Sequence, residues 1–385
     1  MTIPIATLIP IDVAIVGAGP VGMALAALLA RRGMAPERLA LIDARSLGQA
    51  LTDPRSIALS YGSRLLLEEA GAWPLAATPI HQVHVSRRGR FGRSMLDRVD
   101  HDVPALGYVT RYGDLVAALS GACERAGIAT IRPARVTATR EDAVGVTLAL
   151  DDGRELRAAI AVQAEGGVFG NQEPRARQRD YRQTAVIARV AASAPIAHRA
   201  FERFTDEGPL ALLPQDGADG LQYALVWCVR TENAASLLAL GDAAFLARLG
   251  DAFGGRLGRF TRTSTRASYP LGLNAEPGAT SRTVAIGNAA QTLHPVAGQG
   301  LNLGLRDAAV LARLLSHEVT PAQLLAFGAG RDADRKLTVG VTDTMARAFA
   351  GTGPVQTLLG LSLGALDVVK PARMLLAELM MFGRR

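Results

Sequence analysis

The sequence has very little lysine, cysteine or aromatic character. Only two of its 42 Lys and Arg residues are lysines, Lys336 and Lys370, and neither has a pyridoxal-phosphate or phosphate-loop setting. Aromatic residues make up 5% and the arginines are scattered, so a nucleic-acid-binding surface is not expected. Cys123 and Cys228 lie far apart without a CxxC pattern, and the six histidines lack metal-ligand spacing. These absences argue against a disulfide framework and against a metal site.

Long apolar runs are also absent. No uncharged apolar stretch reaches the roughly 20 residues that a membrane-spanning helix needs. The first residues lack the pattern of a secretory signal. We expect a cytoplasmic protein, and we leave open peripheral contact with the inner membrane. The net charge of +7 favours anionic partners such as nucleotide phosphates or anionic lipid.

The N-terminal part predicts an α/β unit. Asp12–Val16 is typical of a buried strand, Val21–Arg32 of an Ala- and Leu-rich helix, and Leu39–Asp43 of a second strand. A strand, helix and strand in this order indicate a parallel sheet with a right-handed crossover. Further elements are expected by the same reasoning: helices over 65–70 and 115–126, and a hairpin of 144–150 with 155–161.

The pattern of apolar and polar residues is different between about Tyr181 and Tyr269. Strand-like alternation and turns predominate there, which predicts an inserted, largely antiparallel domain. Thr283–Ile286 then returns to a buried strand and Leu301–Leu315 to a helix, and the remainder reads as helical.

The first glycine-rich segment is Gly17-Ala18-Gly19-Pro20-Val21-Gly22. It follows a predicted strand, opens a predicted helix and precedes Asp43 by about the 20 residues expected for a ribose-binding acid. Small residues let the turn approach a pyrophosphate, whose charge is met by the amides of the helix N-terminus. An acid at Asp43 would repel a 2′-phosphate, so FAD or NAD is favoured over NADP. An ordinary tight turn is the alternative.

The second glycine-rich segment runs from Val284 to Gly304. A buried strand ends on a polar residue, and a loop with proline and glycines then enters a helix. Such a loop presents backbone amides and a helix dipole to a ligand, and would stabilise the negative charge of a reduced flavin. The alternative is a helix start with turn glycines.

Both segments, with Asp53–Leu59 between them, resemble the class A FAD-dependent aromatic hydroxylases, and more closely their ubiquinone-biosynthesis branch. Within that branch, Arg199–Pro214, Leu225–Cys228 and Gly287–Asn302 look most like the 2-polyprenyl-6-methoxyphenol hydroxylases. The resemblance implies an α/β fold: a Rossmann-like FAD-binding domain with an inserted mainly antiparallel β-sheet substrate domain and a helical C-terminal region. The implied ranges are 1–75, 100–180 and 270–330 for the FAD domain, 76–99 and 181–269 for the substrate domain, and 331–385 for the helical region.

The resemblance also implies roles for individual residues along an FAD molecule. The pyrophosphate would lie on the first glycine segment, the adenosine ribose on an acid, the phosphates and ribityl chain on polar groups, and the isoalloxazine along the second segment. In that order the residues are Gly17, Gly19 and Gly22; Asp43; Arg55, Arg111 and Asn288; and Pro295, Gly298, Gly300, Leu301 and Asn302. For Arg55 and Arg111 a surface ion pair is the alternative.

Three positions depart from the family pattern. Asn288 stands where most members have Asp, and Gln291 where many have His. Asn still donates and accepts hydrogen bonds, so a ribityl contact is kept. In Ala164-Glu165-Gly166, Glu165 replaces the family's Asp, and the Ser and Arg that usually follow are missing. This segment puts binding of the nicotinamide electron donor in doubt.

The implied activity is that of a flavoprotein monooxygenase. It would hydroxylate a polyprenylated phenol through a flavin C4a-hydroperoxide, using FAD, O₂ and NAD(P)H or another reductant. No residue is identified as the catalytic base, since His294 is equally a loop histidine with backbone partners. Leu212, Pro214 and Trp227 are candidates for the substrate pocket, with core filling as the alternative.

The C-terminal segment is apolar and flanked by basic residues. Thr357–Leu366 and Met374–Phe382 could contact an anionic bilayer or another quinone-biosynthesis protein, or instead form core or a homo-oligomer interface. Two other functions remain open for the whole chain. One is a flavin dehydrogenase or oxidase, and the other is a flavin-poor scaffold subunit of a quinone-biosynthesis complex.

Overall fold

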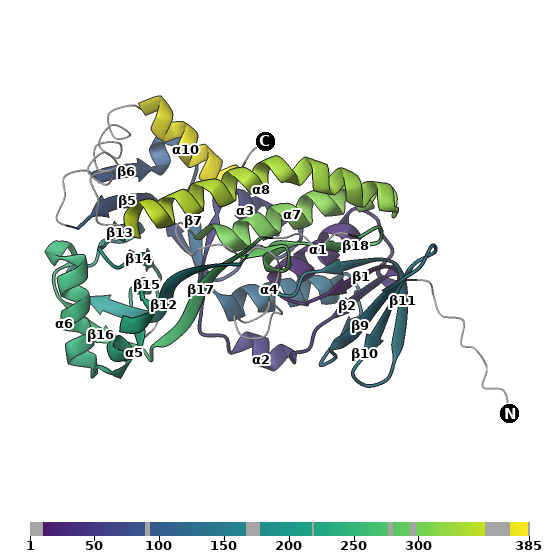
Figure 1. Cartoon of the computed structure of the whole chain (residues 1–385). Coiled ribbons are helices and arrows are strands. Elements are labelled where there is room, and N and C mark those ends of the chain that lie inside the picture. Colours follow the sequence, from purple (N-terminus) through teal and green to yellow (C-terminus); the bar gives the residue numbers. More distant parts are fainter. Residues whose placement is uncertain are drawn as a thin grey trace.

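The computed structural model describes residues 11–88, 93–166, 178–217, 219–275, 280–292, 298–350 and 370–383. Two sheets lie side by side, and the long helix α8 (Pro321–Ala350) lies along α7 (Gln299–Leu315) and extends toward the second sheet (Figure 1). The strands and helices below are those that place the functional residues.

The first sheet is the nucleotide-binding type that the sequence predicts. Its parallel strands are ordered β8-β2-β1-β11-β18. Two antiparallel strands, β10 and β9, follow on the edge of β11 that also carries β18. The bounds are β1 Ile11–Val16, β2 Leu39–Ile42, β8 Thr130–Ile131, β9 Val136–Glu141, β10 Val146–Leu150, β11 Glu155–Gln163 and β18 Thr283–Ala285. The expected hairpin of 144–150 with 155–161 is confirmed as the pair β10 and β11.

Helix α1 (Pro20–Arg31) is buried along nearly its whole length between this sheet and helices α4 (Tyr112–Arg125) and α7 (Gln299–Leu315). Burial on all sides explains why its sequence is apolar all round instead of amphipathic. Met23, Leu25 and Leu28 are each at most 1% exposed, and burying such a side chain contributes roughly 1.5–3 kcal/mol.

A small sheet joins the two large ones. It has the order β3-β7-β4, all antiparallel, and its strands were not expected from the sequence. Their bounds are β3 Ser56–Ser60, β4 Thr78–Ile80 and β7 Gly107–Arg111; the short helices α2 (Leu47–Leu51) and α3 (Tyr61–Glu69) flank β3 in the chain. β3 carries the residues that follow Asp53 and Arg55.

The second large sheet has the order β19-β17-β12-β15-β14-β13-β5-β6, with β16 on β12. Its strands are β5 Gln82–Arg87, β6 Arg93–Asp97, β12 Gln178–Ala192, β13 Arg199–Phe204, β14 Pro209–Pro214, β15 Tyr223–Arg230, β16 Phe260–Thr263, β17 Ala267–Ala275 and β19 Gln291–Thr292. All pairs except β13 with β5 are antiparallel. The sheet takes strands from both expected substrate-domain ranges, 76–99 and 181–269, and extends beyond them at β12, β17 and β19.

One face of this sheet is covered by two helices that the sequence analysis did not anticipate. Helices α5 (Thr231–Ala239) and α6 (Asp242–Phe253) pack on it, and they interrupt the largely antiparallel strands expected between Tyr181 and Tyr269. Their Ala- and Leu-rich sequence has the spacing of an amphipathic helix, and Phe245 and Leu249 on one face of α6 are fully buried.

The C-terminal helix α10 (Lys370–Phe382) contributes to the core. Ala377 and Met381 of α10 (Lys370–Phe382) pack with Leu96 and Leu106 in a small core cluster, so part of the expected apolar tail is core. Thr357–Leu366 lies outside the described residues. Within the described part of the chain, every helix is too short or too polar to cross a bilayer.

Candidate functional site

The first glycine segment forms a tight turn between β1 and α1. Gly17 has φ of 109°, and a Cβ on it would stand 2.6 Å from the carbonyl carbon of Ala164. A Cβ on Gly22 would stand 1.9 Å from the Gly17 oxygen, so both positions exclude any side chain. Gly19 is less crowded, since a Cβ on it would stand 3.5 Å from the Tyr112 hydroxyl. Gly19 is also the N-cap residue of α1, and it has no side chain to cover the first amides of the helix. The turn thus leaves helix amides for an anionic ligand.

Asp43 lies beside this turn, immediately after β2. Its Oδ2 accepts a hydrogen bond of 2.8 Å from the Ala18 amide, and its Oδ1 accepts one of 2.7 Å from the Arg45 amide. Asp43 is 7% exposed, and the Arg132 guanidinium lies 3.9 Å from its carboxylate. The carboxylate is therefore held where the family places a ribose, and ribose binding itself stays a prediction.

The second glycine segment packs directly on the first. Gly287 has φ of 59°, and a Cβ on it would stand 3.2 Å from Val21 Cγ2. A Cβ on Gly304 would stand 2.7 Å from the same atom, so the two glycines admit the Val21 side chain between them. The segments that are distant in sequence therefore form one continuous surface.

The start of α7 is arranged much as the start of α1. Gly298 has φ of 60° and caps the helix without a side chain, and a Cβ on it would stand 3.2 Å from Ala58 Cβ. Asn302 is 2% exposed; its Oδ1 accepts from the Ser60 amide, and its Nδ2 donates to the oxygens of Ala58 and Gly298. Asn302 thus ties β3 to the helix start, a role that the sequence did not reveal.

The other residues expected along the isoalloxazine are placed as follows. Leu301 is partly buried against the main core, and Gly300 faces Asn288, whose Oδ1 would lie 3.9 Å from an added Cβ. Pro295 and His294 lie outside the described residues.

A third segment, Ala164–Gly166, follows β11 between the two glycine segments. The Ala164 amide donates to the Val16 oxygen at 2.7 Å, and an added Cβ on Gly166 would stand 3.5 Å from Asn288 Cβ. The carboxyl ends of the neighbouring parallel strands β1, β11 and β18 thus meet at one edge, where α/β sheets bind nucleotides. Burial and the negative charge of Asp43 raise the pKa of Glu165.

The two arginines expected at the flavin have acidic partners in the chain. Arg55 donates to Asp53 through Nε at 2.9 Å and Nη2 at 2.7 Å, and lies 4.6 Å from the centroid of the Tyr112 ring. Burial alone would raise the pKa of Asp53, but hydrogen bonds and charge from Arg55 lower it. Arg111 is half-exposed and lies 4.0 Å from Asp219 Oδ2. The ion-pair alternative therefore describes both arginines in this structure, and their flavin contacts stay predictions.

The residues at this edge fit an extended dinucleotide such as FAD. Two turns exclude side chains, two helix starts present uncapped amides, and an acid stands beside the first turn. Gln291, buried in the first half of the second segment, has an Nε2 without a hydrogen-bond partner among the described residues. In the described part of the chain, no group of three or more His, Cys, Asp or Glu residues could hold a metal ion.

Two of the residues proposed for the substrate pocket lie in the core beneath α5 and α6. Leu212 is fully buried there, and Trp227 is 5% exposed with its ring 6.1 Å from that of Phe245. Pro214 is buried on the same side of β14 by strand alternation. These positions favour the core-filling alternative. The side chains that alternate with them point to the opposite face of the sheet, and sequence periodicity does not distinguish the two faces.

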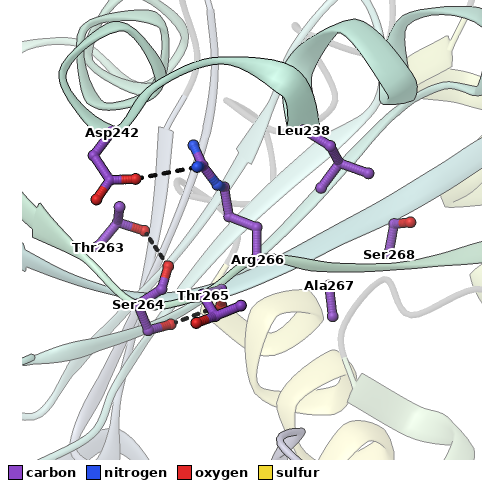
Figure 2. Close-up of a pocket in the computed structure, with 8 residues that line it drawn as sticks. All are labelled: Leu238, Asp242, Thr263, Ser264, Thr265, Arg266, Ala267 and Ser268. Atoms are coloured by element: carbon purple, nitrogen blue, oxygen red, sulfur yellow. Dashed lines mark hydrogen bonds and ion pairs between the residues drawn. The ribbon is translucent and has the colours of Figure 1, made fainter.

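A polar pocket of about 630 Å³ lies on the outer part of this sheet, where the strand β17 meets α5 and α6. Figure 2 shows Arg266 reaching Asp242, and the Nη2 to Oδ1 distance is 3.1 Å. The Arg266 guanidinium also lies 4.9 Å from the centroid of the Phe245 ring. Both contacts are structural, and the pocket contains none of the glycine-segment residues.

Comparison with known proteins shows the family of the chain. Residues 10–326 match the family model described as FAD binding domain. The ubiquinone hydroxylase UbiL of Rhodospirillum rubrum is 34% identical over 94% of this chain and 88% of its own length. The 3-demethoxyubiquinol 3-hydroxylase of Escherichia coli is 30% identical over 80% of each chain.

The fold agrees as well. The crystal structure of PqsL from P. aeruginosa has a TM-score of 0.73 at 22% identity, covering 91% of this chain and 99% of that one. The chain thus belongs to the FAD-binding monooxygenase family that includes the ubiquinone hydroxylases.

Proposed function

We propose that this protein is an FAD-dependent monooxygenase that hydroxylates a polyprenylated phenol in ubiquinone biosynthesis. The observation that carries the proposal is the meeting of the Gly17–Gly22 turn, the Ala164–Gly166 segment and the Gly287 turn at one sheet edge. The names of the relatives supply the substrate class. The match to 2-polyprenyl-6-methoxyphenol in particular rests on sequence resemblance alone.

The bound FAD would supply the chemistry, which is the activation of O₂ and the transfer of one hydroxyl group to a ring carbon. The residues of the chain would bind and orient the FAD and the substrate, and would exclude water. The amides of the turn before α1 would hold the pyrophosphate, and those at the start of α7 would face the flavin ring. Val21, packed between Gly287 and Gly304, fixes the spacing of these two starts.

The electron donor is proposed to be NAD(P)H or another reductant. Glu165 stands where the family has Asp, so a carboxyl group is kept at this position near Asp43. A like charge at this point weakens binding of phosphate groups, so donor and FAD affinity are both expected to depend on salt.

The test begins with purified protein. Flavin absorbance, or uptake of added FAD, is expected; a chain that stays colourless with added FAD would be the scaffold subunit instead. With a polyprenyl-methoxyphenol, a reductant and O₂, the ring-hydroxylated product should form. Hydrogen peroxide without hydroxylated product would indicate the flavin oxidase. Removal of the gene should cause the polyprenyl-methoxyphenol to accumulate.

Contact with a membrane surface is proposed as the route for so apolar a substrate. Large apolar side chains are exposed on the C-terminal helices, with Leu325 of α8 at 74% and Leu375 of α10 at 69%. Sedimentation with anionic vesicles, compared for the wild type and a Leu325→Ser, Leu375→Ser double variant, tests this. Equal binding by both would remove these residues from the contact.

A further inference from the structure

The two faces of the second large sheet differ in how far they are covered. On the outer face, the residues under α5 and α6 are buried, among them Leu210, Leu212, Leu225 and Trp227. On the opposite face, which we term the inner face, the alternating residues keep accessible surface: Val83, Val85, Ile187, Glu202, Ala211, Leu213 and Val226. The strands that carry them are mostly central in the sheet.

The inner face is turned toward the FAD-binding part of the molecule. Val83 and Leu213 pack in a cluster with Ile80 of β4 and Val109 of β7. These strands belong to the small sheet, whose strand β3 contacts the second glycine segment through Ala58 and Ser60. A mostly apolar sheet face directed at the flavin-binding half is where a prenylated aromatic ring would be accommodated.

Glu202 is an acid in the middle of this face. In register across the strands, Val85 of β5 and Ala211 of β14 lie directly opposite it, and Val226 of β15 follows Ala211. Glu202 has no hydrogen bond or ion pair among the residues that the structure describes. Burial raises its pKa to about 8.

Two other ionisable side chains share this face nearby. Cys228 of β15 is 1% exposed, and burial together with the charge of Glu202 raises the pKa of its thiol well above the usual range. Arg87 of β5 lies two residues beyond Val85; it is buried and has interactions of its own. The pKa of Glu202 is shifted by burial and not by either of these groups.

A second polar group marks the flavin end of the same face. Gln215 is 3% exposed; its Oε1 accepts from Ser56 Oγ at 2.9 Å and from Arg189 Nε at 3.0 Å, while its Nε2 lacks a partner among the described residues. Gln215 is four residues beyond Ala211, which corresponds to about 13 Å along a strand. The stretch between them, with Leu213 at its middle, is long enough for one substituted aromatic ring.

We propose that the Glu202 carboxylate accepts the proton of the phenolic hydroxyl of the substrate, which lies along the inner face between Glu202 and Gln215. This inference rests on the proposed function and assigns its base. The phenol O–H bond breaks, a new O–H bond forms on the carboxylate, and the electron pair stays on the phenolate oxygen. The phenolate makes the ring carbon a better nucleophile toward the hydroxyl group that flavin and O₂ supply.

The protons balance once the hydroxyl group has been transferred to the ring. The ring carbon that gained the hydroxyl group releases its hydrogen as a proton to solvent, and the ring oxygen takes back the proton from Glu202. Glu202 thus returns to its starting state. An ordinary carboxylate is too weak a base for a phenol of pKa about 10, and a carboxylate whose pKa is raised toward that value is better matched.

The experiment compares the flavin-loaded wild type with Glu202→Gln, Glu202→Asp and, as a control, Glu232→Gln on the exposed surface of α5. We expect Glu202→Gln to bind FAD normally and to lose roughly a hundredfold in hydroxylation rate, a size typical of a removed general base. The hydroxylation rate of the wild type should rise with pH and reach a plateau above about pH 8. This rise of the rate with pH should be absent in Glu202→Gln. Glu202→Asp should restore part of the rate and of its rise with pH, and Glu232→Gln should match the wild type.

Three results would overturn the assignment. Glu202→Gln could hydroxylate at the wild-type rate. Alternatively, its rate could be lower and still rise with pH as in the wild type, and this second result is what a merely structural role predicts. In both cases the wild type would still hydroxylate the phenol, so the proposed function would stand. A wild type that binds FAD and hydroxylates no phenol would instead refute the proposed function and this inference together.

Discussion

The Oδ1 atom of Asn302 accepts a hydrogen bond of 2.9 Å from the amide of Ser60, although the two residues are 242 positions apart. The Nδ2 of the same side chain donates to the oxygens of Ala58 at 3.1 Å and Gly298 at 2.7 Å. One buried amide therefore holds strand β3 against the start of helix α7. Because Gly298 has no side chain between them, the strand and the helix start lie close enough for these bonds.

Replacing Asn302 with Ala is expected to remove all three bonds and to leave the Ser60 amide buried without its partner. Such a loss costs about 1–3 kcal/mol per buried group. We expect a lower unfolding free energy in urea and a weaker FAD complex. Asn302→Asp keeps the acceptor for Ser60 and should lie between the two. Wild-type stability and FAD affinity in Asn302→Ala would show that the helix start is held in another way.

Gly22→Ala should abolish FAD binding. The added Cβ would stand 1.9 Å from the Gly17 oxygen, which is backbone and cannot rotate away, so the turn must open. Flavin content after purification and FAD titration measure the loss. Gly250→Ala in α6 is the matched control, since an added Cβ there meets nothing within 4 Å and alanine favours helix. Retained flavin in Gly22→Ala would place the pyrophosphate elsewhere.

The sequence predicted the nucleotide half of the fold closely. The expected strand over Asp12–Val16 is β1 at Ile11–Val16, and the helix over Leu301–Leu315 is α7 at Gln299–Leu315. These elements are local and strongly apolar, so their pattern alone determines them. Strand β3 was missed because its partners are at 107–111, and no local pattern reports a pairing at that distance in sequence.

The faces of the second sheet show a different limit. Alternation correctly separates Leu212 and Trp227 from Ala211 and Val226, but it does not tell which set meets helices α5 and α6. Glu202 could have been singled out, since it is the only carboxylic acid in the strand Arg199–Phe204. Sequence does not show whether such an acid is paired, and that depends on β5, β14 and β15.

Glu165→Gln should tighten FAD binding. The Glu165 carboxyl adds negative charge beside Asp43, at the edge proposed for the pyrophosphate. Removing the charge of a partly exposed group changes binding by up to about 1 kcal/mol, which is a two- to fivefold lower Kd at low salt. The gain should shrink as salt rises. Glu155→Gln, at the other end of β11, is the control. An unchanged Kd at low salt would mean that the pyrophosphate lies away from Glu165.

Asp307→Asn should destabilise the fold strongly. Asp307 is fully buried, accepts from Arg331 at 2.8 Å and Arg335 at 2.9 Å, and also accepts from the Gly287 amide. Arg331 keeps its ion pair with Asp334, but Arg335 loses its carboxylate partner, and breaking such a buried pair costs about 3–5 kcal/mol. Asp332→Asn breaks the exposed pair with Lys336 on the same helix and should cost less than about 1 kcal/mol. Similar unfolding free energies for the two variants would contradict this account.

His84 should make stability fall in mild acid. Burial, and then the positive charges of Arg256, Arg199, Arg93 and Arg203, lower the pKa of His84 from 6.5 to about 4. The folded state therefore keeps His84 neutral while the unfolded state takes up a proton below pH 6.5, so stability is lost as pH falls from about 6.5 toward 4.

Replacing His84 with Gln removes this titration and leaves an acceptor for Arg256, whose Nη1 lies 2.9 Å from the His84 Nε2. We expect the wild type to lose roughly 1–3 kcal/mol more than His84→Gln between pH 7 and pH 4.5, as measured by urea unfolding at each pH. His317→Gln, at an exposed position after α7, should follow the wild type. Parallel curves for the wild type and His84→Gln would show that acid destabilisation arises from other groups.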